Sequence, residues 1–259
     1  MPQASFRFYS ELNDFLPAQR RQVSFCCRFD TGQSVKHLVE ALGVPHPEVG
    51  LILVNGKSVG WGYLVKEGDR VSVYPILVSI DIASLVQLQP QPWHGPCFVL
   101  DAHLGRLAVY LRMLGFDTLY RNDYADEELA RVSSDEKRIL LTRDRGLLKR
   151  GLVTQGYCLR ETDPLAQLAE VVRRFDLTRR ATPYWRCLRC NGELTPVDKE
   201  AIWNRVSERT RQYYHEFRIC TGCDRIYWRG SHVEHMQRLI EHALAQFDPG
   251  SQSAARGSE

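Results

Sequence analysis

The chain has 259 residues, 44% of them hydrophobic and 25% charged, with a formal net charge of +3. This composition is typical of a soluble globular protein, and the length allows one large domain or two to three small ones. No apolar run approaches the roughly 20 residues of a membrane helix, and the N-terminus lacks the pattern of a secretory signal. We therefore expect no membrane association and a cytoplasmic location, while the small net charge alone does not indicate a nucleic-acid partner.

Residues 1–80 are expected to form one small α+β domain. The stretch QVSFCCRF predicts a strand, and Ser34 and Gly43 predict the start and stop of a helix. LILVNG then predicts a strand that ends in an Asn-Gly turn, and DRVSVYPI predicts a further strand. Short strands around one helix favour an α+β fold.

Two strings of this stretch, LILVNGKSVG and EGDRVSVYP, give it a resemblance to the ubiquitin-like β-grasp fold. It is most similar to the sulfur-carrier proteins of thiamin and molybdopterin synthesis. Those carriers need a free C-terminal Gly-Gly, whereas this chain continues through Ile76, Leu77 and Val78. We interpret the domain as a fused binding or regulatory module, with a protein partner as an expectation.

Two segments of low regularity flank the remaining domains. Pro90, Pro92 and Pro96 fall in a polar stretch, which predicts a linker over residues 81–96. The small polar residues 248–259 predict a disordered C-terminal tail.

Residues 97–180 alternate between predicted strands and helices. The strands are CFVLD, FDTLYR, RILLTRD and GYCLRE, and helices are expected after the first, second and fourth of them. Such alternation predicts an α/β domain with a largely parallel sheet and helices on its faces.

Carboxylates gather where the strands of this sheet end. Asp101 and Asp144 close two apolar strands, and a second group of acids lies at the start of the middle helix: Asp123, Asp126, Glu127 and Glu128. Carboxylates that meet at one sheet edge repel each other unless a cation lies between them, and Mg²⁺ or Mn²⁺ suits such ligands. A plainer interpretation is that each aspartate caps the following helix, and that acids in a first helical turn only match the helix dipole.

The strings LDAHLGRLAVYLRMLGFDTLY, ADEEL and RILLTRDRGLL resemble the PIN-like ribonuclease family named for the C-terminal domain of the Mut-seven exonuclease. The resemblance covers residues 97 to about 245 and implies an RNA-cleaving enzyme that uses divalent metal. It implies catalytic and metal-binding roles for Asp101 and Asp144, with Asp126 or Glu127 as the helical acid and Glu128 less favoured. Asp163 stays unassigned because it equally suits a helix N-cap.

Several basic residues lie near these acids. For Arg106 and Arg112, on a predicted helix, we favour surface ion pairs, and for Arg143 and Arg145, which flank Asp144, we favour contact with RNA phosphates. The resemblance also makes His232 a candidate for substrate contact.

Four of the eight cysteines form two Cys-x-x-Cys pairs, Cys187 with Cys190 and Cys220 with Cys223. Two such pairs supply four thiolates for one tetrahedral zinc ion, which predicts a structural zinc ribbon over residues 181–247. The alternative is that one pair is a redox dithiol or a set of buried cysteines. The other four cysteines lie in apolar stretches and are expected to be buried.

The leading hypothesis is therefore a metal-dependent ribonuclease with three folded parts: a ubiquitin-like domain, a PIN-like nuclease domain over residues 97–180 and a zinc ribbon. The alternative is a non-catalytic adaptor that binds RNA or the ribosome. A sulfur-transfer accessory factor is a third reading, suggested by the first domain alone.

Overall fold

The structure, a computed structural model, describes residues 1–76, 96–230, 238 and 240. The chain divides into two compact units, residues 1–95 with 125–158, and residues 96–124 with 159–259. The expected tail and nearly all of the expected linker lie outside the described residues. Within the described part, no helix combines the length and the apolar character needed to cross a membrane.

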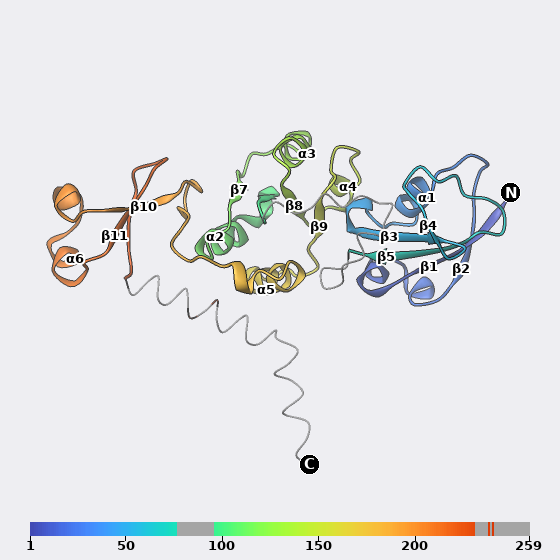
Figure 1. The fold of residues 1–259 in the computed structure, drawn as a ribbon, viewed down its shortest axis with the longest axis horizontal. Coiled ribbons are helices and arrows are strands. Elements are labelled where there is room, and N and C mark those ends of the chain that lie inside the picture. Colours follow the sequence, from blue (N-terminus) through green and yellow to red (C-terminus); the bar gives the residue numbers. More distant parts are fainter. Residues whose placement is uncertain (77–95, 231–237, 239, 241–259) are drawn as a thin grey trace, which may run out of the picture. The chain divides into compact units, whose positions relative to one another are not determined.

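The first unit begins with a five-stranded mixed sheet in the order β2-β1-β5-β3-β4 (Figure 1). Strand β1 pairs in parallel with β5, and the other neighbours are antiparallel. The strands are β1 (Gln3–Phe8), β2 (Phe25–Arg28), β3 (Val49–Val54), β4 (Lys57–Ser58) and β5 (Arg70–Pro75). The N-terminal domain is thus the ubiquitin-like sheet that the sequence indicated.

Alternation along β1 and β5 separates the two faces of this sheet. Phe6 and Phe8 of β1 and Val71 and Val73 of β5 are buried, whereas the intervening side chains are partly or fully exposed. This period of two builds a core on one face and leaves the other face to solvent. Strand β1 was not predicted, although it lies between β2 and β5.

Helix α1 (Val35–Ala41) buries Val35, Leu38 and Val39 in the core of this domain. Its predicted N-cap is confirmed, because the Ser34 hydroxyl accepts a hydrogen bond from the backbone N–H of His37. Its predicted stop is also confirmed, because Gly43 follows the helix end in a left-handed conformation with φ of +107°.

A second sheet has four strands in the order β7-β6-β8-β9. Strand β6 pairs in parallel with β7, and β8 pairs in parallel with β9. The strands are β6 (Phe98–Leu100), β7 (Thr118–Tyr120), β8 (Ile139–Thr142) and β9 (Gly156–Cys158). The helices of this α/β region are α2 (Gly105–Met113), α3 (Asp126–Asp135), α4 (Arg145–Leu148) and α5 (Pro164–Arg174).

Within the first unit, polar contacts join the ubiquitin-like sheet to the segment with β8, α4 and β9. The buried carboxylate of Glu48 accepts a hydrogen bond of 2.5 Å from the backbone N–H of Cys158. The Lys149 ammonium donates to the backbone oxygen of Glu40 at 2.7 Å. Buried polar groups of this kind are costly to separate from their partners, so they fix the arrangement of this unit.

The second unit contains β6, β7, α2, α5 and the cysteine-rich region. The Phe98 ring makes edge contacts with the rings of Phe116 and Phe175, and helices α2 and α5 pack against each other. Asp163 caps α5, because its carboxylate accepts the backbone N–H groups of Leu165 and Ala166. Asp163 therefore serves as the helix N-cap, one of the roles that its sequence position suited.

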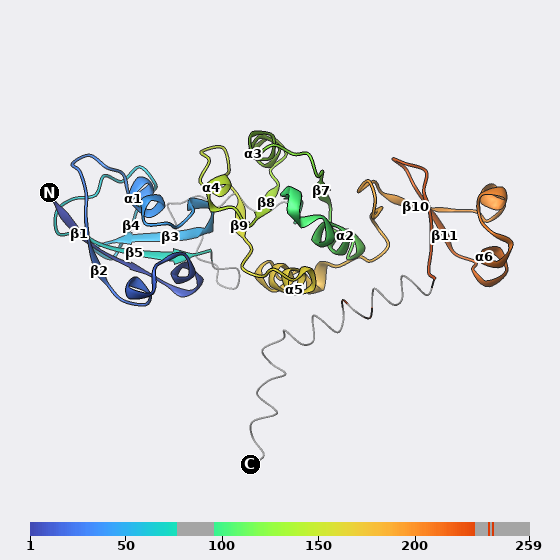
Figure 2. The same ribbon diagram turned by 180° about the vertical axis from the view of Figure 1, so that it is seen from behind.

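The cysteine-rich region forms an antiparallel sheet in the order β10-β11-β12. Its strands are β10 (Leu194–Val197), β11 (Phe217–Cys220) and β12 (Ile226–Trp228), and the first two are labelled in the orange part of the ribbon in Figure 2. Its apolar core consists of Ile202, Val206 and Phe217, with partly buried aromatic rings around them.

The expectation of burial for the four unpaired cysteines was wrong for Cys26. Cys158 is buried, Cys27 and Cys97 are half-buried, and Cys26 is exposed. Cys26 lies on the edge strand β2, whose alternating residues face solvent, so its apolar sequence neighbours do not cover it.

Candidate functional sites

The two predicted Cys-x-x-Cys pairs meet at one point. The Sγ atoms of Cys187, Cys190, Cys220 and Cys223 all lie within 4.8 Å of one another. The Cys187–Cys223 and Cys190–Cys220 Sγ distances are 3.6 Å and 3.3 Å. Zinc–sulfur bonds of about 2.3 Å in a tetrahedron place sulfur atoms roughly 3.8 Å apart. The four thiols are thus positioned to hold one metal ion.

Both pairs have the same backbone geometry. The N–H of Asn191 donates to the oxygen of Cys187, and the N–H of Asp224 donates to the oxygen of Cys220, each at 3.0 Å. Asn191 and Asp224 both adopt a left-handed conformation, with φ of 69° and 54°. Asn and Asp tolerate this conformation better than most residues, so both turns can close tightly around a sulfur pair.

Gly192 allows the two turns to approach each other. A Cβ atom at this position would lie 2.9 Å from the Sγ of Cys220, closer than a real side chain allows. The turn formed by the first pair therefore packs directly against a cysteine of the second.

The pKa of the Cys187 thiol is lowered, so this thiol ionises more readily than an ordinary cysteine. Burial disfavours its charged form, but hydrogen bonds from the Tyr227 hydroxyl and from backbone N–H groups outweigh burial and lower the pKa of Cys187 to about 6. The thiolate is the form of cysteine that binds metal, so these donors favour a ligand at this position.

Helix α2 and strand β7 hold the first cysteine turn from the other side. The buried guanidinium of Arg112 donates from Nη1 to the backbone oxygens of Leu188 and Arg189, both at 3.1 Å. Its Nε donates to the oxygen of Thr118 at 2.9 Å. Arg112 is therefore a structural bridge from the α/β region to the cysteine turn, and the expected surface ion pair at this position was wrong.

Asn191 completes this bridge. Its side-chain oxygen accepts the backbone N–H of Thr118 at 2.9 Å, and its amide donates to the carboxylate of Asp117 at 2.7 Å. One residue of the cysteine turn thus binds both the edge strand β7 and the residue before it.

Asp101 follows β6 and is buried, with 5% of its surface exposed. One carboxylate oxygen accepts the backbone N–H of Ala102 at 2.6 Å, and the other lies 3.0 Å from Nε2 of His103. The segment that follows is fixed by the Tyr120 hydroxyl, which donates to the oxygen of Ala102 at 2.8 Å. Asp101 is thus held at the end of its strand, and it also serves as the cap that the plainer interpretation expected.

Asp144 follows β8 and is exposed. Its Oδ1 accepts the backbone N–H of Gly146 at 2.6 Å, so it also caps the next helix. Its backbone N–H donates to the hydroxyl of buried Thr142 at 2.9 Å. Within the described part of the chain, the second carboxylate oxygen of Asp144 has no hydrogen-bond partner.

The helical acids stand at the first turn of α3, as predicted. Asp126 lies 3.5 Å from Nη2 of Arg150, and Glu127 lies 3.9 Å from Nη1 of the same side chain. The Asp126 and Glu127 side chains are 49% and 75% exposed, so Arg150 partly neutralises them without burying them. The basic residue beside these acids is therefore Arg150, which the sequence did not single out.

The candidate phosphate-binding residues lie in different surroundings. Arg143 is exposed. The Arg145 guanidinium stands over the Phe15 ring, 5.0 Å from its centroid, and donates to the Phe15 backbone oxygen at 3.5 Å. His232 lies outside the described residues.

Comparison with known proteins identifies both halves of the chain. The family model of the Mut7-C RNAse domain matches residues 96–240, and the family model of the Mut7-C ubiquitin matches residues 1–81. Among solved structures, the crystal structure of H. volcanii small archaeal modifier protein 1 is 16% identical. The similarity covers 30% of this chain and 100% of that chain, with a TM-score of 0.25. No match was found among curated proteins.

Proposed function

Because the chain belongs to the Mut7-C RNAse domain family, we propose that it is a metal-dependent ribonuclease that hydrolyses phosphodiester bonds of RNA. The observation that carries this proposal is the match over residues 96–240, within which apolar strands end at Asp101 and Asp144. A family name alone is a weak warrant for activity, so the argument depends on these acids.

The two aspartates hold the same position relative to a strand. Asp101 directly follows the end of β6, and Asp144 lies just past the end of β8. Active sites of open α/β sheets form where strands end. Under this proposal, Asp101 and Asp144 act together, and Asp126 or Glu127 supplies the third carboxylate.

The donor chemistry of these residues fits a hard divalent cation. All the proposed ligands are carboxylate oxygens, which Mg²⁺ and Mn²⁺ prefer. Asp144 retains a carboxylate oxygen without a partner in the described residues, while Asp101 is held rigid at the end of β6. A bound cation would activate water and stabilise charge on the phosphodiester. Asp101 and Asp144 would hold it, and the exposed Arg143 would contact a phosphate.

We further propose that the four cysteines bind structural zinc. A site with four cysteine ligands leaves no open position for catalysis, so its contribution is to the fold. Through the hydrogen bonds of Arg112 and Asn191, bound zinc would also stabilise β7, the strand next to β6.

Cleavage of a mixed pool of structured and single-stranded RNA, with Mn²⁺ or Mg²⁺ added, tests the proposal. The comparison is between wild type, Asp101→Asn, Asp144→Asn and Asp135→Asn, with EDTA as a metal-free control. Asp135 is an exposed acid at the end of α3, so Asp135→Asn matches the change in charge without touching the proposed site.

We expect wild type and Asp135→Asn to cut RNA, and we expect both site variants and EDTA to abolish cutting. Variants that cut like wild type would show that the activity lies elsewhere. RNA binding without any cutting would instead favour the non-catalytic adaptor. A parallel comparison of Asp126→Asn with Glu127→Gln would identify the helical acid, since only one of them should lose activity to the same degree.

A further inference from the structure

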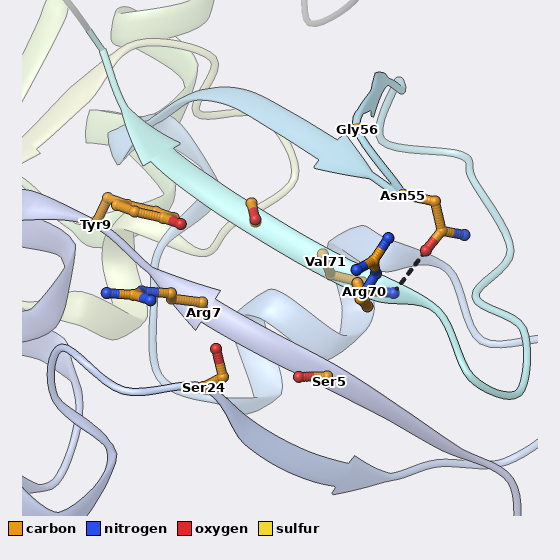
Figure 3. A pocket seen from close by; sticks show the side chains of 9 residues that line it. Ser5, Arg7, Tyr9, Ser24, Asn55, Gly56, Arg70 and Val71 are labelled. Atoms are coloured by element: carbon orange, nitrogen blue, oxygen red, sulfur yellow. Dashed lines mark hydrogen bonds between the residues drawn. The ribbon is translucent and has the colours of Figure 1, made fainter.

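A polar cavity of about 250 Å³ lies on the solvent face of the ubiquitin-like sheet (Figure 3). Strand β1 contributes Ser5 and Arg7, strand β5 contributes Arg70 and Ser72, and the turn after β3 contributes Asn55. The parallel register of β1 and β5 sets Ser5 opposite Arg70 and Arg7 opposite Ser72. The two arginines therefore lie diagonally across one pair of strands, each beside a serine.

The charge of this cavity is positive and uncompensated. No carboxylate lines it, and in the described part of the chain neither Arg7 nor Arg70 forms an ion pair. Two guanidinium groups on adjacent strands without an acidic partner create a positive potential, which favours an anionic ligand.

The walls of the cavity are fixed by hydrogen bonds and ring contacts that leave the guanidinium N–H donors of both arginines available. The Asn55 side-chain oxygen accepts the backbone N–H of Arg70 at 3.0 Å, and its amide donates to buried Asp69 at 2.8 Å. At the other end the Tyr9 ring stacks on Tyr74 at 4.2 Å between centroids. The Arg7 guanidinium lies over Tyr9, 5.2 Å from the ring centroid, which limits its motion while leaving its donors available.

The size and the polarity of the cavity select among anions. Sites for whole small molecules usually enclose roughly 300–1,000 Å³ and are lined mainly by apolar side chains. This cavity is smaller, and its lining is mostly hydroxyl, amide and guanidinium groups. Protein interfaces need an apolar or aromatic centre, and Val71, a buried residue, is the only aliphatic side chain among the lining residues described. The one aromatic ring among them, Tyr9, is already stacked on Tyr74 and covered by Arg7. A phosphate group within a longer polymer fits these conditions better than an acidic protein does.

We propose that this cavity is a phosphate-binding subsite for single-stranded RNA, with Arg7 and Arg70 as the charged donors and the serine hydroxyls as further donors. The choice of RNA rests on the proposed ribonuclease function. The subsite would hold a backbone phosphate of the substrate and carry no base specificity, because phosphate contacts position a strand without reading it.

The test is binding of a fluorescent single-stranded oligoribonucleotide to the full chain without added Mg²⁺ or Mn²⁺, which avoids cleavage and leaves the proposed zinc in place, over a range of salt concentrations. Arg7→Gln and Arg70→Gln are compared with Arg28→Gln. Arg28 is an exposed arginine of β2 that does not line the cavity, so this control removes the same charge from the same sheet. Arg7→Lys keeps the charge, and thermal unfolding checks that all variants fold.

We expect Arg7→Gln and Arg70→Gln each to weaken binding by about tenfold and to reduce the slope of log affinity against log salt by about 0.7, the value for one phosphate contact on a single strand. Arg7→Lys should keep most of the affinity, and Arg28→Gln should bind nearly like wild type. Equal effects of Arg7→Gln and Arg28→Gln in folded proteins would overturn the subsite.

Two competitors distinguish the source of the anion. Displacement of the RNA by inorganic phosphate at matched phosphate concentration would assign the cavity to a free phosphate and overturn the RNA subsite. Polyglutamate that binds as tightly as RNA, with the same dependence on Arg7, would assign it to an acidic protein and equally overturn it. Failure of the subsite and failure of the ribonuclease proposal are separable, because RNA cleavage by wild type with metal is measured independently of this binding.

Discussion

Replacement of buried Arg112 by methionine should weaken the attachment of the cysteine turn to the α/β region. Arg112 is 4% exposed, and its guanidinium satisfies three backbone oxygens, those of Thr118, Leu188 and Arg189. Methionine keeps most of the apolar stem in place and removes all three donors, so the change isolates the hydrogen bonds from the packing.

The magnitude follows from the three carbonyl groups that lose their donor. The bond to Thr118 is buried and the bonds to Leu188 and Arg189 are partly buried, so each lost donor costs toward the lower end of about 1–3 kcal/mol, and removal of a buried charge returns part of that cost. A net destabilisation of about 3 kcal/mol results if each carbonyl contributes about 1 kcal/mol. For a chain of this size, that corresponds to a fall in Tm of roughly 6–12 °C. Burial also lowers the pKa of Arg112, which agrees with a site where the charge is retained for its hydrogen bonds.

The assay is thermal unfolding of zinc-loaded protein together with the rate of zinc transfer to a colorimetric chelator. Arg106→Met is the matched control, because Arg106 is an exposed arginine of the same helix. We expect Arg112→Met to melt earlier and to release zinc faster than the control, since the carbonyls of Leu188 and Arg189 lie within the first cysteine turn. If the two variants melt together and release zinc equally slowly, Arg112 does not bridge the two regions.

Three further changes have defined outcomes. Cys220→Ser should bind less than one zinc equivalent by elemental analysis, because the ion loses one of four thiolates, and a full equivalent would exclude the four-cysteine site. Gly105→Ala would place a Cβ atom 2.7 Å from the Tyr120 hydroxyl and should destabilise the protein by about 1–3 kcal/mol in urea unfolding, whereas Gly151→Ala, which has open space, should not. Burial lowers the pKa of His46. Below the unfolded value of about 6.5 the unfolded chain therefore binds more protons than the folded chain, and the free energy of unfolding should fall between pH 7 and pH 5. His46→Asn should flatten this pH dependence of the free energy of unfolding.

Local patterns predicted the elements whose ends are marked by side-chain chemistry. Ser34 and Asp163 cap the helices that they were expected to begin, and Gly43 and Gly115 follow helix ends with positive φ. These signals work because a cap or a left-handed residue acts on backbone groups within a few residues of itself. The two cysteine turns were predicted equally well, since the Cys-x-x-Cys spacing is typical of the turn that each pair forms.

Strand β1 and the bridge through Arg112 were not predicted, and both depend on distant residues. The alternation of Ala4, Phe6 and Phe8 is a strand pattern, but its parallel partner β5 lies far along the chain. Arg112 follows an apolar helical face, and nothing near it in sequence shows that the carbonyls of a cysteine turn will cover it. For Asn191 a signal was present, because asparagine directly after a Cys-x-x-Cys pair suits the left-handed position found there.

The end of the ubiquitin-like sheet argues against the sulfur-carrier reading of the first domain. At the last described residue of this domain, the backbone N–H of Ile76 donates to the oxygen of Glu48 at 3.3 Å. Gly50 allows this contact, because a Cβ atom there would lie 2.6 Å from the Cα of Ile76. The same Glu48 binds the backbone of Cys158 through its buried carboxylate. The end of the described part of this domain is thus held against Glu48, the residue that connects the domain to β9, whereas a carrier needs a free terminus.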